Sequence, residues 1–238
     1  MWSSEPEVTA LVCTDCGRTM SGLDDDIIHF CSGCRSVWSL ESGRLVQFPF
    51  YTARTPSEQP GAPDLHLPFW LVRISTPGIS ILVRREHTSS PLEFPRNFDP
   101  SAERNLESIT TEPEDRLVAV PAFLCERASR IGRQVTRHLT PVSDSDVPAR
   151  ALAGGVVTGG EAESLAGEIA LIDMRRRNPG LAWAAALPDA RLKGVMAVGF
   201  NLLAHGLQLA GIRLVLPYTT MADVRALIDF LDLTVPDG

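Results

Sequence analysis

The chain has 238 residues, of which 44% are hydrophobic and 21% are charged, and its formal net charge is −7. This composition is typical of a soluble globular protein, and the length suits a small module plus one larger domain. A net acidic chain is a poor general binder of nucleic acids, because phosphate contacts require clustered Lys and Arg. No apolar run approaches the ~20 residues that span a bilayer, so we expect no membrane-spanning segment.

The first residues lack the pattern of an export signal. Residues 1–6 contain no basic side chain and no apolar core. We therefore expect a cytoplasmic location, where thiols are kept reduced.

Four of the five cysteines form two CxxC pairs with fourteen residues between them. A CxxC turn directs two thiolates at one ion, and a second turn from a facing hairpin completes a tetrahedral site of four sulfurs, which suits zinc. Four protein ligands leave no position for water or substrate, so the ion is expected to be structural. The predicted Zn²⁺ ligands are Cys13, Cys16, Cys31 and Cys34.

Residues around the pairs agree with this interpretation. Gly17 follows the first pair, where a positive φ is often needed, and Gly33 lies inside the second. Phe30 and Trp38 flank the second pair and are expected to cover the metal. Residues 39–46 are predicted to form a hairpin with its turn at Ser42-Gly43.

Residues 11–50, with these pairs and this hairpin, resemble the zinc-ribbon superfamily. The resemblance implies a small β module with the four cysteines as metal ligands, and no activity. The order of ribbon, proline-rich linker, Leu67-Pro68-Phe69-Trp70 and Val120-Pro121-Ala122-Phe123 is also similar to a group of uncharacterised bacterial zinc-ribbon proteins, which implies no activity either.

Two alternatives remain open for the same thiols. Two disulfides would require an oxidising compartment, and a rubredoxin-like iron site would use the same four ligands. His29 is expected to be a strand residue, because four thiols already saturate the ion. Residues 1–50 carry seven acidic and three basic side chains, which weighs against contact between the ribbon and DNA or RNA.

The predicted fold class is α+β, with a zinc ribbon at residues 1–50, a proline-rich linker at 51–64 and an α+β domain at 65–238. In that domain we expect antiparallel hairpins and three or four helices. Three proline–aromatic pairs at strand edges leave two related halves open as an alternative, but they do not establish a repeat. The predicted strands are residues 65–74 and 79–85, which form a hairpin around Pro77-Gly78, then 117–123, 192–203 and 208–218. The predicted helices are residues 124–137, 161–177, 181–187 and 220–231, the last capped by Thr220 with Asp223. Residues 86–116 are expected to be a long flexible loop, with a mobile lid, a partner-binding arm or a missed helix at 102–109 as the alternatives. Residues 140–149 are expected to be a further loop.

Three other features bear on function. One helix face carries four arginines, Arg127, Arg130, Arg133 and Arg137, which fit a solvated helix face better than a surface for anions or an acidic partner. The glycine-rich residues 154–160 lack the Lys-Ser/Thr ending of a P-loop, and Glu161 and Glu163 place negative charge where phosphate would lie. Cys125 is expected to be a buried small hydrophobe.

These observations favour a non-enzymatic protein that acts as a protein-interaction or assembly subunit, an adaptor, in a bacterial complex. A nucleic-acid-associated regulatory factor is the alternative, supported only by the arginine row. An enzyme is the second alternative: no histidine lies in a recognisable catalytic motif, but His66, His87 and acidic residues could converge in space. The sequence does not indicate the oligomeric state.

Overall fold

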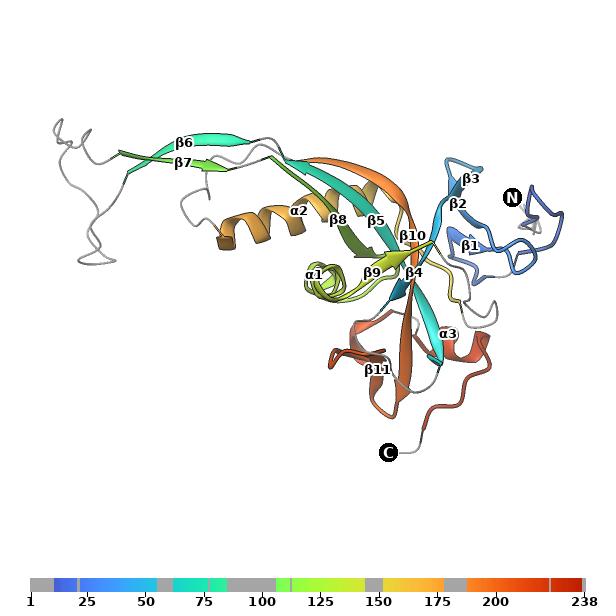
Figure 1. The fold of residues 1–238 in the computed structure, drawn as a ribbon. Helices are drawn as coiled ribbons and strands as arrows, with labels where there is room; N and C mark the ends of the chain where they lie inside the picture. Colours follow the sequence, from blue (N-terminus) through green and yellow to red (C-terminus); the bar gives the residue numbers. More distant parts are fainter. Residues whose placement is uncertain are drawn as a thin grey trace, which may run out of the picture.

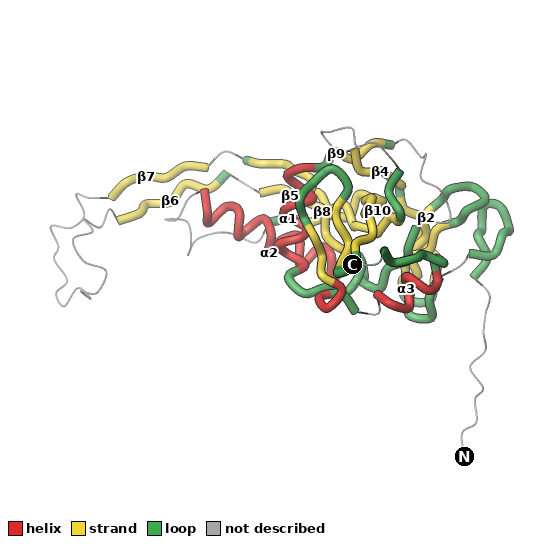
Figure 2. Tube along the Cα trace, turned by 90° about the horizontal axis from the view of Figure 1, so that it is seen from below, coloured by secondary structure: helices red, strands yellow, loops and turns green. Residues whose placement is uncertain are grey.

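A computed structural model describes residues 11–20, 22–54, 62–76, 78–84, 106–111, 113–143, 152–177, 188–222 and 224–236. The described chain forms a small three-stranded sheet near its N-terminus, a seven-stranded sheet with packed helices, and a two-stranded arm (Figure 1). The small sheet and the arm lie at opposite ends of the molecule in both views (Figure 2). The architecture confirms the predicted α+β class with an N-terminal β region.

The small sheet is an antiparallel meander of β1 (Ile28–Phe30), β2 (Val37–Glu41) and β3 (Arg44–Phe48). The β2–β3 turn holds Ser42 at φ 49° and Gly43 at φ 77°. Two consecutive positive φ values are typical of the type I′ turn, whose twist matches the strands it joins. The predicted hairpin and its turn are therefore confirmed.

The large sheet is organised around two long antiparallel strands, β5 (Leu65–Thr76) and β10 (Asp189–Leu203). β5 is buried at ten of its twelve positions, because both faces of the sheet are covered. β8 (Glu114–Pro121) pairs with the free edge of β5. β4 (Phe50–Arg54) and β11 (Gly206–Leu209) pair with β10. β12 (Val215–Pro217) then pairs with β11, and β9 (Thr140–Val142) pairs with β4.

The two faces of the sheet have different partners. On one face, the alternate β5 side chains Leu67, Phe69 and Leu71 belong to one buried cluster with α1 (Ala128–His138) and α3 (Val224–Phe230). On the other face, Trp70 and Val72 pack with α2 (Gly159–Arg177) and with the small sheet. A short 3₁₀ turn, η4 (Tyr218–Thr220), precedes α3. No helix among the described residues is long and apolar enough to cross a membrane.

The predicted hairpin at residues 65–85 is wrong. β5 pairs with β8 and β10, whereas β6 (Ile79–Arg84) pairs with β7 (Leu106–Thr111), so the chain continues past Gly78 into the arm instead of turning back. The Pro-Gly signal marks a break between two strands, not a reversal. β7 and the start of β8 also replace part of the loop and helix expected at 86–116; residues 85–105 lie outside the described part.

The expected start of the linker is also incorrect. Residues 51–54 belong to β4, which runs parallel to β10 with Tyr51 opposite Met196, while residues 55–61 lie outside the described part. Residues 140–142, expected as loop, form β9 on the other edge of β4. Residues 192–203 do form a hairpin with the next segment, but that segment is split into β11 and β12.

The helix boundaries differ from the expected ones for local reasons. α1 begins at Ala128, and Leu124, expected on its buried face, precedes it and is 57% exposed. α2 begins two residues early, because Thr158 caps it. Thr220 does not cap α3, since it lies in η4 and its hydroxyl donates to the Pro217 carbonyl. Asp223 and residues 181–187 lie outside the described residues.

Helix α1 lies very close to the edge strand β8. The Thr136 hydroxyl accepts the Ala119 amide proton at 2.9 Å and donates to the Gly132 carbonyl at 2.8 Å, so it satisfies an amide on the open edge of β8. A Cβ on Gly132 would overlap the Ala119 carbonyl oxygen and lie 3.0 Å from Ile169 Cδ1. The close approach therefore depends on glycine at this position.

We predict that Gly132→Ala lowers the free energy of unfolding by about 1–3 kcal/mol, because helix and strand must separate. Gly160→Ala in α2 is the matched control, since no atom lies within 4 Å of its Cβ position. Urea unfolding of both variants checks this. Equal stability of Gly132→Ala and the parent protein would contradict the packing described here.

Buried His66 in β5 generates a pH prediction. Its Nδ1 is buried without a hydrogen-bond partner, and burial lowers the pKa of His66 from 6.5 to about 4. As the pH falls, His66 of the unfolded chain is protonated before His66 of the folded chain. The protein is therefore most stable above pH 6.5, where His66 is neutral in both states, and it loses stability as the pH falls from 6.5 toward 4. Between about pH 7 and pH 5 the loss should be about 2 kcal/mol.

The measurement is the difference in urea midpoints between about pH 7 and pH 5 for the parent and for His66→Gln. The variant should lose less stability on acidification, although His29, whose pKa burial also lowers, contributes to both proteins. An identical pH dependence in the two proteins would show that His66 is not the group responsible.

Candidate metal centre

The first CxxC turn is closed by two backbone hydrogen bonds. The Gly17 amide donates to the Cys13 carbonyl at 2.9 Å, and the Cys13 amide donates to the Arg18 carbonyl at 2.9 Å. The second turn repeats the pattern at the same spacing: Arg35 donates to the Cys31 carbonyl at 2.8 Å and Cys31 to the Ser36 carbonyl at 2.9 Å. The two turns are therefore equivalent knuckles that present their cysteines in the same way.

Each turn has a positive φ after its second cysteine. Gly17 has φ 71°, as expected, and the corresponding residue of the second turn is Arg35 with φ 59°. Gly33 is not in this conformation. Glycine is needed there because a larger residue would not fit: a Cβ would lie 2.5 Å from the Arg18 side chain and 3.1 Å from Cys16 Sγ.

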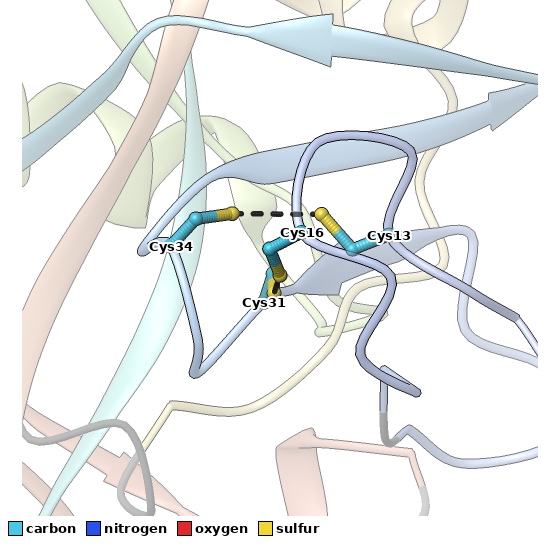
Figure 3. Close-up of side chains that lie close together, drawn as sticks. All are labelled: Cys13, Cys16, Cys31 and Cys34. Carbon is cyan, nitrogen blue, oxygen red and sulfur yellow. Dashed lines mark hydrogen bonds between the residues drawn. The ribbon is translucent and has the colours of Figure 1, made fainter.

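The four sulfur atoms converge between the two turns (Figure 3). All of them lie within 4.8 Å of one another. Cys13 Sγ lies 3.5 Å from Cys34 Sγ, and Cys16 Sγ lies 3.3 Å from Cys31 Sγ. A tetrahedral zinc ion with Zn–S bonds of about 2.3 Å separates its sulfurs by about 3.8 Å. The cluster therefore has the donor set and the approximate size of a four-thiolate metal site.

The disulfide alternative does not fit this arrangement. All four cysteines are free thiols, and their closest sulfurs are farther apart than the ~2.0 Å of a disulfide bond. His29 lies in β1 opposite Trp38, outside the cluster, as expected of a strand residue. Among the described residues, only the four predicted ligands form this cluster.

A hydroxyl that the sequence reasoning did not single out supports the thiolates. Ser36 Oγ lies 2.9 Å from Cys34 Sγ and 3.7 Å from Cys13 Sγ, and it accepts the indole N–H of Trp38 at 2.7 Å. Since the indole can only donate, the hydroxyl proton of Ser36 is available to a sulfur. The signal in the sequence was a small polar residue two places after a CxxC pair.

The two aromatic residues expected to cover the metal behave differently. Trp38 is 5% exposed and packs with Cys13, Met20 and Cys31, as expected. Phe30 does not belong to this cluster. Its ring lies 5.2 Å from that of Phe50, on the side of the large sheet. Successive strand residues point to opposite faces, and Phe30 pairs with Val37, so it lies on the face opposite to that of Trp38.

The surroundings shift the pKa values of Cys13 and Cys16 in opposite directions. Burial raises the pKa of Cys13, but the amides of Cys16 and Asp15 and side-chain hydrogen bonds lower it to about 6 overall. The Arg18 amide lowers the pKa of Cys16, but its contact with Cys31, burial and the other thiols raise it to about 12. A divalent cation at the centre would allow all four to be thiolates.

The glycine-rich segment joins the ribbon to the large sheet. The Gly155 carbonyl accepts the amides of Ile27 and Ile28 at 2.7 and 2.9 Å, and the amides of residues 156–157 donate to the Ala122 carbonyl at 2.8 and 3.0 Å. This segment therefore holds β1 beside the end of β8.

The same segment is not a phosphate site. A Cβ on Gly154 would overlap the Asp26 carboxylate. Thr158 and Glu161 form a reciprocal capping box at the start of α2, with the Thr158 amide donating to Glu161 Oε2 at 2.8 Å. The helix terminus that a phosphate would need is already occupied.

The four arginines predicted as one row differ in their surroundings. Arg137 pairs with Asp173 of α2 at 3.4 Å, and Arg116 approaches the same carboxylate at 3.3 Å. Arg133 is half-buried, while Arg130 is exposed and Arg127 precedes the helix with φ 60°. At least Arg137 therefore forms an ion pair within the protein, as arginines on an ordinary helix face often do.

Of the two histidines considered for an enzyme, only His66 lies in the described part of the chain. His66 is buried in β5, and His87 lies outside the described residues. None of the three described cavities has a histidine among its lining residues. Cys125 is half-buried against the core, and burial raises its pKa to about 12, which leaves it a protonated thiol.

Neither a family model, nor a curated protein, nor a solved structure matches the chain. The resemblance to zinc ribbons therefore rests on the spacing of the cysteines and on the geometry of the two turns.

We predict that Ser36→Ala weakens zinc binding by about tenfold, because outer hydrogen bonds to ligands typically contribute about 10- to 100-fold to affinity. Competition with a chromophoric chelator measures the change. Ser32→Ala is the control, since Ser32 is exposed in the same turn. Equal affinities for Ser36→Ala and Ser32→Ala would mean that the hydroxyl does not support the thiolates.

Proposed function

We propose that the chain is a non-enzymatic zinc-ribbon protein that acts as a protein-interaction or assembly subunit of a bacterial cytoplasmic complex. The observation that carries the proposal is the convergence of four cysteine sulfurs within 4.8 Å on two equivalent turns. Such a ligand set fills the coordination sphere of zinc and leaves no open position for water or substrate. The ion would therefore stabilise a shape instead of catalysing a reaction.

Zinc is preferred to iron on chemical grounds. Both metals accept four thiolates in a tetrahedron. Zinc has no redox chemistry, and a structural role requires none. Elemental analysis and the absence of visible absorption in the purified protein would separate the two metals.

By ordering the ribbon, the ion would stabilise the contact between the ribbon and the large sheet. Ile28 and Val37 of the ribbon lie in the same buried cluster as Trp70 and Val72 of β5. Phe48 packs edge-on against Trp70 at 5.1 Å. A metal-ordered ribbon would thus become one rigid body with the α+β domain, which suits a protein that presents a surface to a partner.

An association with nucleic acid has less support. The chain and its ribbon are acidic, and Arg137 of the arginine row is paired with Asp173. A phosphate backbone would gain few free cations on this face.

The function itself is tested by isolating the tagged chain from its native host under mild conditions. A subunit should purify with a stoichiometric protein partner, and the complex should survive nuclease treatment. Recovery of the chain alone, or only with nucleic acid, would contradict the proposal.

We predict one zinc ion per chain and a linked loss of order when it is removed. Chelation should speed amide hydrogen exchange in β1 to β3 and also in residues 154–157, because Gly155 accepts the amides of Ile27 and Ile28. Exchange in β11, which is farther along the sheet, is the internal control. Unchanged exchange in the ribbon after chelation would show that no metal orders it.

A further inference from the structure

Two cavities adjoin one another beside the ribbon. One, of about 610 Å³, lies between the acidic turn at residues 24–26, the glycine-rich segment and the start of α3. The other, of about 500 Å³, lies between residues 121–125 and the first turns of α1 and α2. Phe123 and Leu124 line both cavities. Because they share these two residues, the two hollows are considered together and are here named the Leu124 groove.

The exposure of Leu124 is built into a held backbone. Its side chain is 57% exposed, the largest value among the exposed large hydrophobic residues in the described part of the chain. Its carbonyl accepts the Ala222 amide at 3.2 Å, and the next residue, Cys125, forms a β-bridge with Met221. Phe123 packs edge-on against Phe69 at 5.5 Å. Leu124 therefore presents an apolar side chain to solvent between the two cavities, on a backbone held by hydrogen bonds.

Among the described residues that line the groove, the charged side chains have one sign: five are acidic and none is basic. Asp24 and Asp25 are exposed at one end, and Glu168 is exposed at the other. Glu161 is ionised within its capping box, because hydrogen bonds from Thr158 lower its pKa, and Asp26 is buried. The apolar centre is therefore flanked at both ends by negative charge.

An apolar centre with acidic ends favours a ligand that combines an apolar group with positive charge. An apolar side chain would cover Leu124 and Phe123, and Lys or Arg side chains on either side of it would reach the two acidic ends. Phosphate groups and acidic segments would be repelled. The first residues of this chain are themselves acidic, with Glu5 and Glu7 and no basic residue, so they do not complement the groove.

We propose that the Leu124 groove binds a basic amphipathic segment of a partner protein, with an apolar anchor over Leu124 and cationic side chains at both ends. This inference rests on the proposed function, because it names the surface and the kind of partner through which the subunit would act. Burial of the anchor supplies affinity, and the acidic ends supply orientation and partner choice.

The experiment is a selection from a random peptide display library against the full, zinc-loaded chain, followed by fluorescence anisotropy on the enriched peptides. We expect enriched sequences with basic residues on both sides of an apolar one. Leu124→Ser should weaken their binding at least about tenfold. Asp24→Asn combined with Asp25→Asn should weaken binding and reduce its dependence on salt.

The control is Leu117→Ser, because Leu117 is 41% exposed on β8 and lines neither half of the groove. Zinc content and urea midpoint establish that each variant is folded, and the Asp24/Asp25 variant keeps the test decisive if Leu124→Ser is unstable. The proposal is overturned by a selection that enriches nothing, by enrichment of acidic or uncharged sequences, or by binding that is unchanged in both groove variants.

The native partner separates this proposal from the broader one. A partner that still binds the Leu124→Ser protein with full affinity would rule out the groove while leaving the interaction function intact. Absence of any partner would refute the interaction function, whatever peptides the groove selects in vitro.

Discussion

The structure of the N-terminal region depends on four cysteine sulfurs held within 4.8 Å of one another. The apolar cluster beneath them contains only Cys13, Met20, Cys31 and Trp38 as buried members among the described residues. A buried cluster this small contributes little stability by itself, and small natural domains commonly add a metal or disulfides. Hydrogen bonds among the thiols lower the pKa of Cys13 and raise that of Cys16, and a cation at their centre would favour the thiolate form of each.

The other face of the ribbon links the metal site to the rest of the molecule. Ile28 and Val37 belong to the same core as Trp70, and the Gly155 carbonyl ties β1 to the segment that leads into α2. The ribbon is therefore connected to the elements that line the Leu124 groove. An ion bound by the four cysteines would in this way hold the shape of the groove without touching it.

The parts that sequence reasoning predicted correctly are local. The CxxC spacing, Gly17 and the Ser42-Gly43 turn each follow from the geometry of a few consecutive residues. The errors concern distant partners: nothing near Pro77-Gly78 indicates that β5 pairs with β8 and β10, and β4 was hidden by the proline-rich residues that follow it. Ser36 was overlooked because a serine has no periodicity, and only the position of its hydroxyl beside Cys34 gives it importance.

The most direct test of the metal-centred account is X-ray absorption spectroscopy at the zinc edge of freshly purified protein. The account predicts a single shell of four sulfur atoms at about 2.3 Å around one zinc ion per chain. Nitrogen or oxygen ligands in that shell, iron in place of zinc, or metal-free protein with the four cysteines joined as disulfides would contradict it.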